Sequence, residues 1–309
     1  MAAKLGPSII NNGLVLDLDA ADKNSYIGSG TSWKDMTGNG NSGTLVNGPS
    51  FSSANGGSIV FDGVDDYVNL RGGGYLNNWS PDGIDSALSY RAYTSANVWF
   101  KTSTISTGGV NKMIFSDSAF EYGFFHNNAT LYFGAYGLQT TTIVANTWYN
   151  ACLVANLGRP NTGTYVQSGT TTITCTTSYP ITMSNGNTIS IIFSSGTATS
   201  GNYVVTVTGS NTFTITAASA ATTSGNHYYS TNTNISYITA YLNGVQIGSQ
   251  VAANTVNGIN DAPFLLGKDN NSATSYFTGN IAMLQLYNKN LTVTEILQNY
   301  NATKGRFTL

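Results

Sequence analysis

Side chains that can do acid–base or nucleophilic chemistry are scarce in this chain: only 8% of its 309 residues are Asp, Glu, Lys or Arg. The two glutamates, Glu121 and Glu295, are far apart in the sequence, and so are the two histidines, His126 and His227. Glycoside hydrolysis uses two carboxyl groups about 5–9.5 Å apart, whereas a zinc site or a Ser-His-Asp triad needs a histidine beside further partners. The spacing of these residues supplies no such set, and we expect both histidines to be surface or hydrogen-bonded polar residues. We therefore expect no catalytic residues and a non-enzymatic function.

Asp17 and Asp19 lie two residues apart in an alternating segment, residues 14–19. The alternation places three leucines on one face of an extended segment and both aspartates on the other. It predicts a half-buried strand that carries two carboxylates on its polar face.

Oxygen ligands, in contrast, are abundant in the predicted turns. Asp62, Asp65 and Asp66 lie in one turn between two predicted strands, and glycines and asparagines crowd the segment 33–45. Such side chains can ligate a hard cation, or they can form Asx turns with their own backbone. Both interpretations stay open. The further oxygen donors that could join the turn are Asp35, Asn39, Asn41, Asp269 and Asn270.

The composition indicates an all-β protein with a nearly uncharged surface. The chain has 34 Gly, 19 Tyr and 13 Phe, together with many Ser, Thr and Asn residues, which are strand and turn formers. A formal net charge of −2 provides no field that would attract nucleic acid or an anionic membrane. The N-terminus lacks the apolar core of a signal peptide, so we expect synthesis in a cytoplasm without export by that route.

An insertion between the two strands of one predicted hairpin indicates the domain organisation. Residues 147–154 and 235–248 read as its two strand regions, and Asn243-Gly244 within the second is a strong hairpin signal. The intervening residues carry no charged side chain between Arg159 and Asp261. We expect a main domain of residues 13–155 and 235–309, an N-terminal arm of residues 1–12, and an inserted module of residues 156–234. Such an insertion is tolerated because loop-closure entropy grows only logarithmically with loop length.

The inserted module is expected to be a small antiparallel β-barrel or sandwich. Its strand-length runs are residues 171–176, 189–193, 203–208 and 212–216, separated by Gly, Asn and Ser turns. A disordered Ser/Thr tract is the alternative, but regularly placed Ile, Val, Phe and Tyr residues argue against it. Cys152 and Cys175 fall in different predicted modules, so we expect two reduced, partly buried thiols.

One short helix is expected near the C-terminus. Thr292 and Glu295 have the spacing of a capping box, in which each side chain binds a backbone N–H at the helix start. Ile296 and Tyr300, with Leu297 beside them, would pack against the sheet.

Four motifs in sequence order carry a resemblance to a known family. They are the segment 33–41, the segment 61–68, the strand around Trp148, and residues 241–244, followed by a closing strand at 279–292. In this order they resemble the laminin-G and concanavalin A-like jelly-roll superfamily. The resemblance implies an all-β jelly-roll sandwich that carries the inserted small β-module and one short C-terminal helix.

The resemblance also implies possible ligands and activities. Members of this superfamily include glycosidases, but Glu121 has no second acid nearby, and Asp17 and Asp19 lie on an opening strand without a catalytic role in the family. A Ca²⁺ ion at the sandwich rim would use Asp62, Asp65 and Asp66 with Asp35, Asn39, Asn41 and Asp269. Sugar binding would use aromatic side chains that could equally be core or rim packing. The candidate aromatic residues are Trp79, Tyr90, Tyr93, Tyr228 and Tyr229.

The C-terminal segment 301–307 and the inserted module resemble parts of structural proteins from tailed bacteriophages, cyanophages in particular. This resemblance implies a virion surface protein, as capsid decoration or a fibre or tip component, with weak glycan adhesion. A capsid-cementing protein that binds no sugar is the main alternative, and a glycoside hydrolase is the third. The expected partners are other virion proteins, copies of the chain itself and cell-surface glycans, with no nucleic acid and no membrane. The residues 1–12 have no predicted partner of their own, and we expect them to anchor the protein to the particle.

Overall fold

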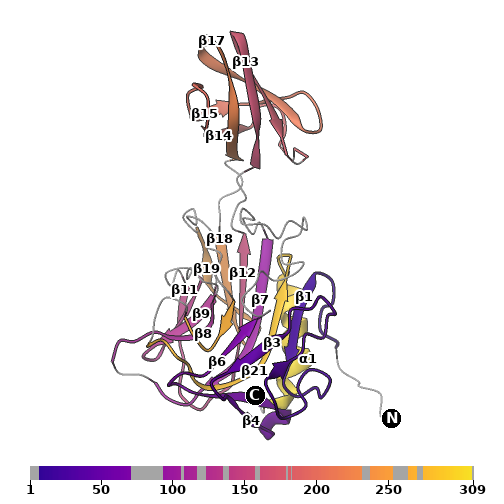
Figure 1. Cartoon of the computed structure of the whole chain (residues 1–309), viewed down its shortest axis with the longest axis vertical. Helices are drawn as coiled ribbons and strands as arrows, with labels where there is room; N and C mark the ends of the chain where they lie inside the picture. The colour runs from indigo at the N-terminus through magenta and orange to yellow at the C-terminus, as the bar shows by residue number, and fades with distance from the viewer. Residues whose placement is uncertain are drawn as a thin grey trace. The chain divides into compact units, whose positions relative to one another are not determined.

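The computed structural model divides the chain into two compact units (Figure 1). The main unit comprises residues 1–157 and 236–309, and the inserted unit comprises residues 158–235. The residues that the structure describes are 7–70, 93–105, 108–116, 123–134, 139–156, 161–178, 180–181, 183–231, 237–252, 264–269 and 274–307.

The main unit is a sandwich of two antiparallel eight-stranded sheets. The first sheet has the order β19 (Val245–Ala252), β18 (Tyr237–Leu242), β12 (Tyr149–Asn156), β7 (Tyr93–Thr102), β21 (Thr278–Tyr287), β5 (Ser58–Asp62) and β4 (Ser50–Ser52), with β1 (Leu14–Asp19) also paired to β21. The second sheet has the order β11 (Gln139–Thr142), β10 (Thr130–Phe133), β9 (Gly123–Asn127), β8 (Lys112–Ser116), β20 (Leu265–Leu266), β6 (Tyr67–Leu70), β3 (Gly43–Val46) and β2 (Ser32–Trp33). A short 3₁₀ helix, η1 (Ala54–Gly56), precedes β5.

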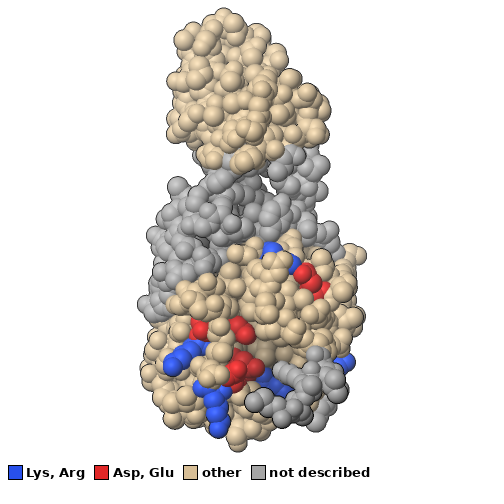
Figure 2. All heavy atoms as spheres, turned by 90° about the vertical axis from the view of Figure 1, so that its right-hand side faces the viewer, with Lys and Arg blue, Asp and Glu red and all other residues tan. Residues whose placement is uncertain are grey.

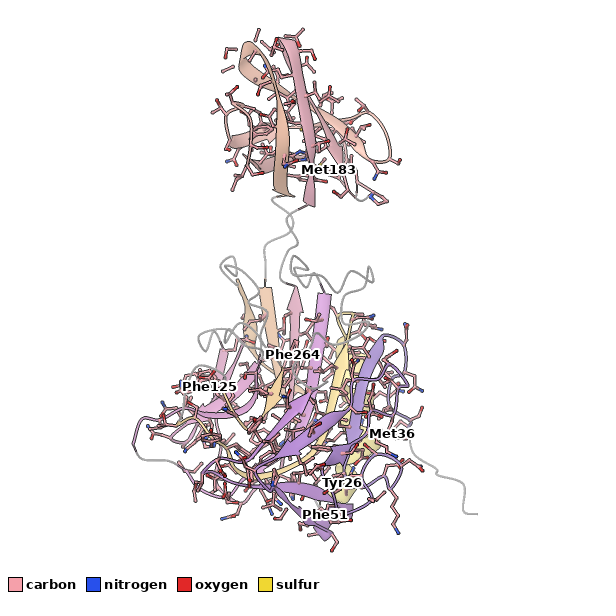
Figure 3. The ribbon with its side chains drawn as sticks, in the orientation of Figure 1. Tyr26, Met36, Phe51, Phe125, Met183 and Phe264 are labelled. Atoms are coloured by element: carbon pink, nitrogen blue, oxygen red, sulfur yellow. The ribbon has the colours of Figure 1, made fainter. Side chains whose placement is uncertain are left out.

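The apolar core lies between the two sheets. In the second sheet, the strand register aligns Val68, Leu266, Phe115, Phe124 and Phe133 in one row, and all five are fully buried. This is the inward half of the alternation that the sequence predicts for a half-buried sheet. At one end of the core, Tyr26 and Phe51 pack with their ring centroids 5.6 Å apart (Figure 3).

The hairpin that the sequence predicted across the insertion is present. β12 and β18 pair in antiparallel register from Ala151 opposite Leu242 to Asn156 opposite Tyr237. β18 then continues into β19 through Asn243 and Gly244, whose φ angles of 52° and 77° suit a type I′ turn. The inserted residues therefore begin after β12 and end before β18, the strand that pairs with β12 in the first sheet.

The predicted alternation in β1 is only partly correct. A register shift between Leu14 and Leu16 forms a bulge, so that Val15 is buried in the core next to Leu16 and Leu18. Leu14 packs instead with the cluster on the opposite face of this sheet. A bulge re-aims side chains in this way because one extra residue faces a single partner.

The outer face of the first sheet is covered by α1 (Val293–Thr303) and η4 (Lys304–Arg306). The predicted capping box between Thr292 and Glu295 is formed. Ile296 is buried, whereas Leu297 is 44% exposed and lies with Tyr300 over Gly244, at the turn between β18 and β19. Below the helix, the Trp99 ring stacks on Phe307 at 4.1 Å between centroids.

The N-terminal arm has a partner within its own chain, contrary to the sequence-based expectation. The Ile10 backbone N–H donates to Asn299 Oδ1 at 2.8 Å, and Gln298 Nε2 donates to the Ser8 carbonyl at 2.8 Å. Both partners lie on α1, so the described part of the arm, residues 7–12, is bound to the C-terminal helix.

The inserted unit is one five-stranded antiparallel sheet that bends back on itself. Its strands are β13 (Asn161–Thr177), β14 (Thr188–Phe193), β15 (Gly201–Val204), β16 (Thr206–Val207) and β17 (Thr212–Thr231), in the order β13-β17-β14-β15 with β16 beside β17. The bend brings residues of one strand together: a Cβ atom on Gly163 would lie 2.1 Å from the carbonyl oxygen of Thr176. Only a residue without a side chain permits this approach. A separate core fills the fold, including Ile173, Ile189, Ile191 and Phe213.

The two cysteines, Cys152 and Cys175, are buried free thiols, as expected. The described residues include no helix long and apolar enough to span a bilayer. On the face drawn in Figure 2, the charged side chains all belong to the main unit.

Candidate functional site

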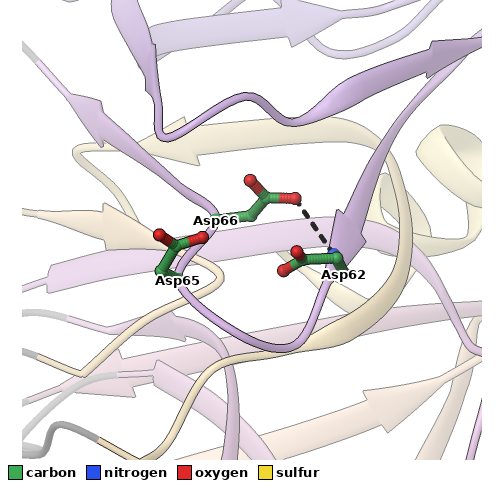
Figure 4. Close-up of side chains that lie close together, drawn as sticks. All are labelled: Asp62, Asp65 and Asp66. Atoms are coloured by element: carbon green, nitrogen blue, oxygen red, sulfur yellow. Dashed lines mark hydrogen bonds between the residues drawn. The ribbon is translucent and has the colours of Figure 1, made fainter.

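The turn between β5 and β6 brings three aspartates together. Asp62, Asp65 and Asp66 each offer a carboxylate oxygen, and these oxygens lie within 4.8 Å of one another (Figure 4). The backbone also uses some of these oxygens: Asp66 Oδ2 accepts from the Asp62 N–H at 3.0 Å, and Asp62 Oδ1 accepts from the Val64 N–H at 2.8 Å. The turn is therefore both an Asx-type turn and a concentration of negative charge.

The electrostatics of this turn favour a cation. Burial raises the pKa of Asp66 above its usual value; the hydrogen bond from Asp62 N–H opposes this, and the charges of Asp62 and Asp65 raise the pKa further. A cation held among the three carboxylates would relieve that repulsion. Hard oxygen donors suit Ca²⁺, which takes six to eight oxygens, so the three carboxylates fit as part of a Ca²⁺ ligand set.

Asp35, Asn39 and Asn41 belong to a different place, so the expectation that they converge on the aspartate turn is wrong. Asp35 accepts from the Thr37 N–H at 3.0 Å and the Asn41 N–H at 3.1 Å, and both asparagine amides donate to the Val15 carbonyl. These bonds fasten the loop to β1. The strands β3 and β6 pair in antiparallel register, with Gly43 opposite Leu70 and Val46 opposite Tyr67. The loop precedes Gly43 and the aspartate turn precedes Tyr67, so they lie at opposite ends of this strand pair.

Asp269 is fully buried. It follows β20 on a segment that passes close to the aspartate turn, because a Cβ on Gly267 would lie 3.3 Å from the Asp66 carbonyl oxygen. Asn270 lies outside the described residues.

A group of two tyrosines and one lysine lies beside the aspartate turn. The Lys268 ammonium is 4.7 Å from the centroid of the Tyr67 ring and 5.6 Å from that of Tyr276, within cation–π range. All three side chains are partly exposed. We call Tyr67, Lys268 and Tyr276 the tyrosine–lysine group.

The register explains why these side chains face outward. Tyr67 alternates with the buried Val68 on β6, and therefore lies on the face of the second sheet away from the core. On that same face, Phe125 and Tyr132 stack with their rings 4.7 Å apart and nearly parallel. The outer face thus carries two sets of aromatic side chains. Sequence analysis missed both, although the alternation around Val68 places Tyr67 on the outer face.

Of the five aromatic residues named from the sequence, Tyr229 is the one whose side chain the structure describes. Tyr229 is 2% exposed in the core of the inserted unit, so its interpretation as a glycan platform is wrong. Trp79 and Tyr90 lie outside the described residues. Tyr93 and Tyr228 lie in β7 and β17, and the structure does not describe their side chains.

A family model described as the concanavalin A-like lectin/glucanases superfamily, Laminin_G_3, matches residues 161–297. Together with the two packed sheets, it establishes the architecture. The chain has a concanavalin A-like fold. The predicted all-β class, with a single short C-terminal helix among the described residues, is therefore confirmed.

Solved structures with this fold share little sequence with the chain. A Trypanosoma rangeli sialidase in complex with sialic acid superposes with a TM-score of 0.52 at 10% identity, covering 99% of this chain and 37% of the sialidase. The binding domain of Paraclostridial Mosquitocidal Protein 1 gives 0.50 at 12% identity, covering 94% and 52%. The receptor binding domain of botulinum neurotoxin C/D mosaic serotype gives 0.50 at 12%, covering 94% and 51%. The chain thus spans about half of each toxin structure. No curated protein sequence matches it.

In this concanavalin A-like sandwich, Asp17 and Asp19 line a cavity of about 310 Å³ between residues 7–9, β1, β21 and the C-terminal helices. Burial raises the pKa of Asp17 to about 6, against a hydrogen bond from Gln285 that lowers it. Asp19 is different, because Arg306 Nη1 lies 2.8 and 2.9 Å from its two carboxylate oxygens. A single Arg306 nitrogen therefore bridges both carboxylate oxygens of Asp19 and holds this side chain in an ion pair.

Two further acid–base residues, Glu295 and His126, are also committed to the fold. Partial burial would raise the pKa of Glu295, but hydrogen bonds from Lys289 and Thr292 lower it below its usual value, which suits a cap and not a general acid. His126 is 1% exposed, and its Nε2 lies 3.2 Å from the Thr102 hydroxyl. Of the two alternatives expected for the histidines, surface or hydrogen-bonded, His126 is the hydrogen-bonded one. Glu121 lies outside the described residues.

Proposed function

We propose that this protein is a non-enzymatic surface component of a tailed-phage particle that adheres weakly to glycans. The observation that carries this proposal is the tyrosine–lysine group beside the aspartate turn on the outer face of the second sheet.

This surface has the chemistry of a sugar site. Aromatic rings pack against the C–H faces of sugars, and an ammonium and carboxylates bind sugar hydroxyls. Asn69, which shares the outward face of β6 with Tyr67, adds a buried amide oxygen with no hydrogen-bond partner. An unpartnered buried acceptor is costly, so a ligand hydroxyl that donates to it would be favoured. Structures with the same fold include a binding domain and a receptor binding domain of toxins, which is consistent with adhesion.

The state of the described carboxylates supports the non-enzymatic part of this proposal. Hydrolysis needs one free carboxylate and one carboxylic acid close together. Asp17 could supply the acid because of its raised pKa, but its neighbour Asp19 is held by Arg306. The aspartates of the turn are better arranged for a cation than for proton transfer.

Placement on a virion is supported by the sequence resemblance of residues 301–307 and of the inserted unit to phage structural proteins. Capsid decoration and a fibre or tip component are both compatible with two compact units. A capsid-cementing protein that binds no sugar is the alternative. It would use the same outer face to contact a neighbouring subunit, and its binding would not respond to free sugars.

Gold-labelled antibody against the purified protein, imaged on intact particles, tests the virion assignment. Label on the capsid lattice supports decoration, whereas label at the tail supports a fibre or tip component. Particles without label contradict the virion assignment. Free sugars that compete for adhesion of the protein to cells separate adhesion from cementing.

A further inference from the structure

The inserted unit contains a cavity that none of the functions above uses. Its volume is about 490 Å³, and it opens where the bent β13 brings Gly163 next to Thr176. Hydroxyl and amide side chains line it, including those of Thr164, Ser194 and Asn226. His227 also lines the cavity.

His227 is buried in an unusual way. The residue is 1% exposed, and neither ring nitrogen has a hydrogen-bond partner. Its ring packs edge-on against Phe213 at 5.9 Å and stacks near Tyr229 at 6.0 Å. Sequence analysis expected a surface or hydrogen-bonded histidine here, and the structure contradicts this.

A hydrogen-bond partner for the His227 ring would stabilise this arrangement. Buried polar atoms in folded proteins are almost always hydrogen-bonded, and a buried imidazole with two unpartnered nitrogens is destabilising. The ring is next to a cavity large enough to admit a small molecule. A ligand that both donates to and accepts from the imidazole would remove the penalty.

The charge state of the site limits what that ligand can be. Burial lowers the pKa of His227 to about 4, although the nearby backbone of Thr164 opposes this without reaching hydrogen-bonding geometry. The imidazole is then neutral at pH 7 and has one donor and one acceptor. No charged residue occurs between Arg159 and Asp261, so none of the residues that line the cavity carries a charge to pair with an ionic ligand.

We propose that this cavity binds a neutral saccharide, with one ring nitrogen of His227 hydrogen-bonding a sugar hydroxyl. Resting on the adhesive function proposed above, this assigns the inserted unit its own sugar site. A sugar hydroxyl can both donate and accept a hydrogen bond, so it can bond to either nitrogen of the neutral imidazole. The surrounding Thr, Ser and Asn side chains complete the polar contacts at the rim, as in other sites where a few polar groups fix a ligand.

Nitrogen-15 NMR of the imidazoles in the full chain tests the proposal directly, because the protein has only two histidines. The probes are the methyl glycosides of glucose, galactose, mannose, xylose and N-acetylglucosamine, each added to about 50 mM to reach dissociation constants in the millimolar range. At least one sugar should shift the His227 signals in a saturable way and leave those of His126 unmoved. Unchanged His227 signals with all five sugars would overturn the proposal.

Variants locate the binding. Ser194→Ala removes a cavity hydroxyl and should weaken the responding sugar about fivefold, the usual effect of one neutral hydrogen bond. Ser210→Ala, at an exposed residue that does not line the cavity, is the matched control and should change nothing. Equal affinity in both variants would contradict the assignment.

A third protein separates this inference from the adhesive function of the main unit. Tyr67→Ala with Tyr276→Ala removes the tyrosine–lysine group and should leave the His227 response intact. If the unmodified protein adheres to glycans but no sugar moves the His227 signals, the adhesive function stands and the cavity assignment fails. If the His227 signals respond but the adhesion does not depend on Tyr67 and Tyr276, the cavity assignment stands and the main-unit site fails.

Discussion

Replacing Asp17 with Asn should stabilise the main unit at neutral pH. Asp17 is at the end of a chain of buried amides: its Oδ1 accepts from Gln285, whose Oε1 accepts from Asn97, whose Oδ1 accepts from Asn150. An Asn at position 17 keeps an oxygen for Gln285 and removes the charge that burial disfavours. The substitution therefore isolates the cost of ionising this one carboxyl.

The magnitude follows from the pKa. Raising the pKa from 3.8 to about 6 corresponds to about 3 kcal/mol between the folded and unfolded states at 25 °C. Because the folded pKa is the higher one, the folded state binds the proton more tightly. The relative stability of the unmodified protein is then greatest below about pH 4 and falls as the pH rises through 6. Allowing for relaxation around the charge, we expect Asp17→Asn to gain about 1–3 kcal/mol at pH 7.5 and little at pH 4.

Urea unfolding followed by tryptophan fluorescence measures the free energy of unfolding of the main unit, because no tryptophan lies in the inserted unit. His126 has its pKa lowered to about 4 by burial, so its contribution to stability is lost as the pH falls below about 6.5. That contribution is common to both proteins and cancels in the difference. Asp65→Asn, at an exposed carboxylate, is the matched control in EDTA buffer. A stability difference for Asp17→Asn that is negative, or that does not change between pH 4 and pH 7.5, would refute the reasoning.

Three further results are expected. Millimolar Ca²⁺ should raise the melting temperature, with about 2.7 kcal/mol of stabilisation at a hundredfold excess over Kd; EDTA and Asp65→Asn should remove the effect, and identical melts in both buffers would leave the turn without a metal role. Replacing residues 156–234 by a short Gly/Ser linker should leave a main unit that melts cooperatively, because β12 and β18 already pair as a hairpin; an insoluble product would contradict this. Thr292→Ala should cost about 0.5–2 kcal/mol by removing the capping box, whereas Thr294→Ala on the exposed side of the same helix should cost less.

Features encoded within a few residues could be predicted from the sequence. The Asn243-Gly244 turn and the Thr292 capping box depend on local backbone geometry, and both occur where the sequence places them. The burial of Val15 could not be foreseen, because the bulge in β1 is set by its pairing with β21.

The candidate sites depended on longer-range contacts. Tyr67 and Tyr276 are more than two hundred residues apart in sequence, and only the pairing of β6 with β20 brings their segments together. Sequence alternation separates the residues of a strand into two faces, but it does not predict which face a bent sheet encloses. For this reason the burial of Tyr229 in the core of the inserted unit was not predicted. His227 was misjudged for the same reason.

The most direct test of the account is a single binding and hydrolysis assay on immobilised laminarin, agar and peptidoglycan. We expect the unmodified protein to be retained by at least one of these glycans and to release no reducing sugar above the blank. The protein with Tyr67→Ala and Tyr276→Ala should fold normally and lose most of that retention. Sugar release by the unmodified protein, or equal retention of both proteins, would contradict the claim that the tyrosine–lysine group forms a non-enzymatic glycan-binding site.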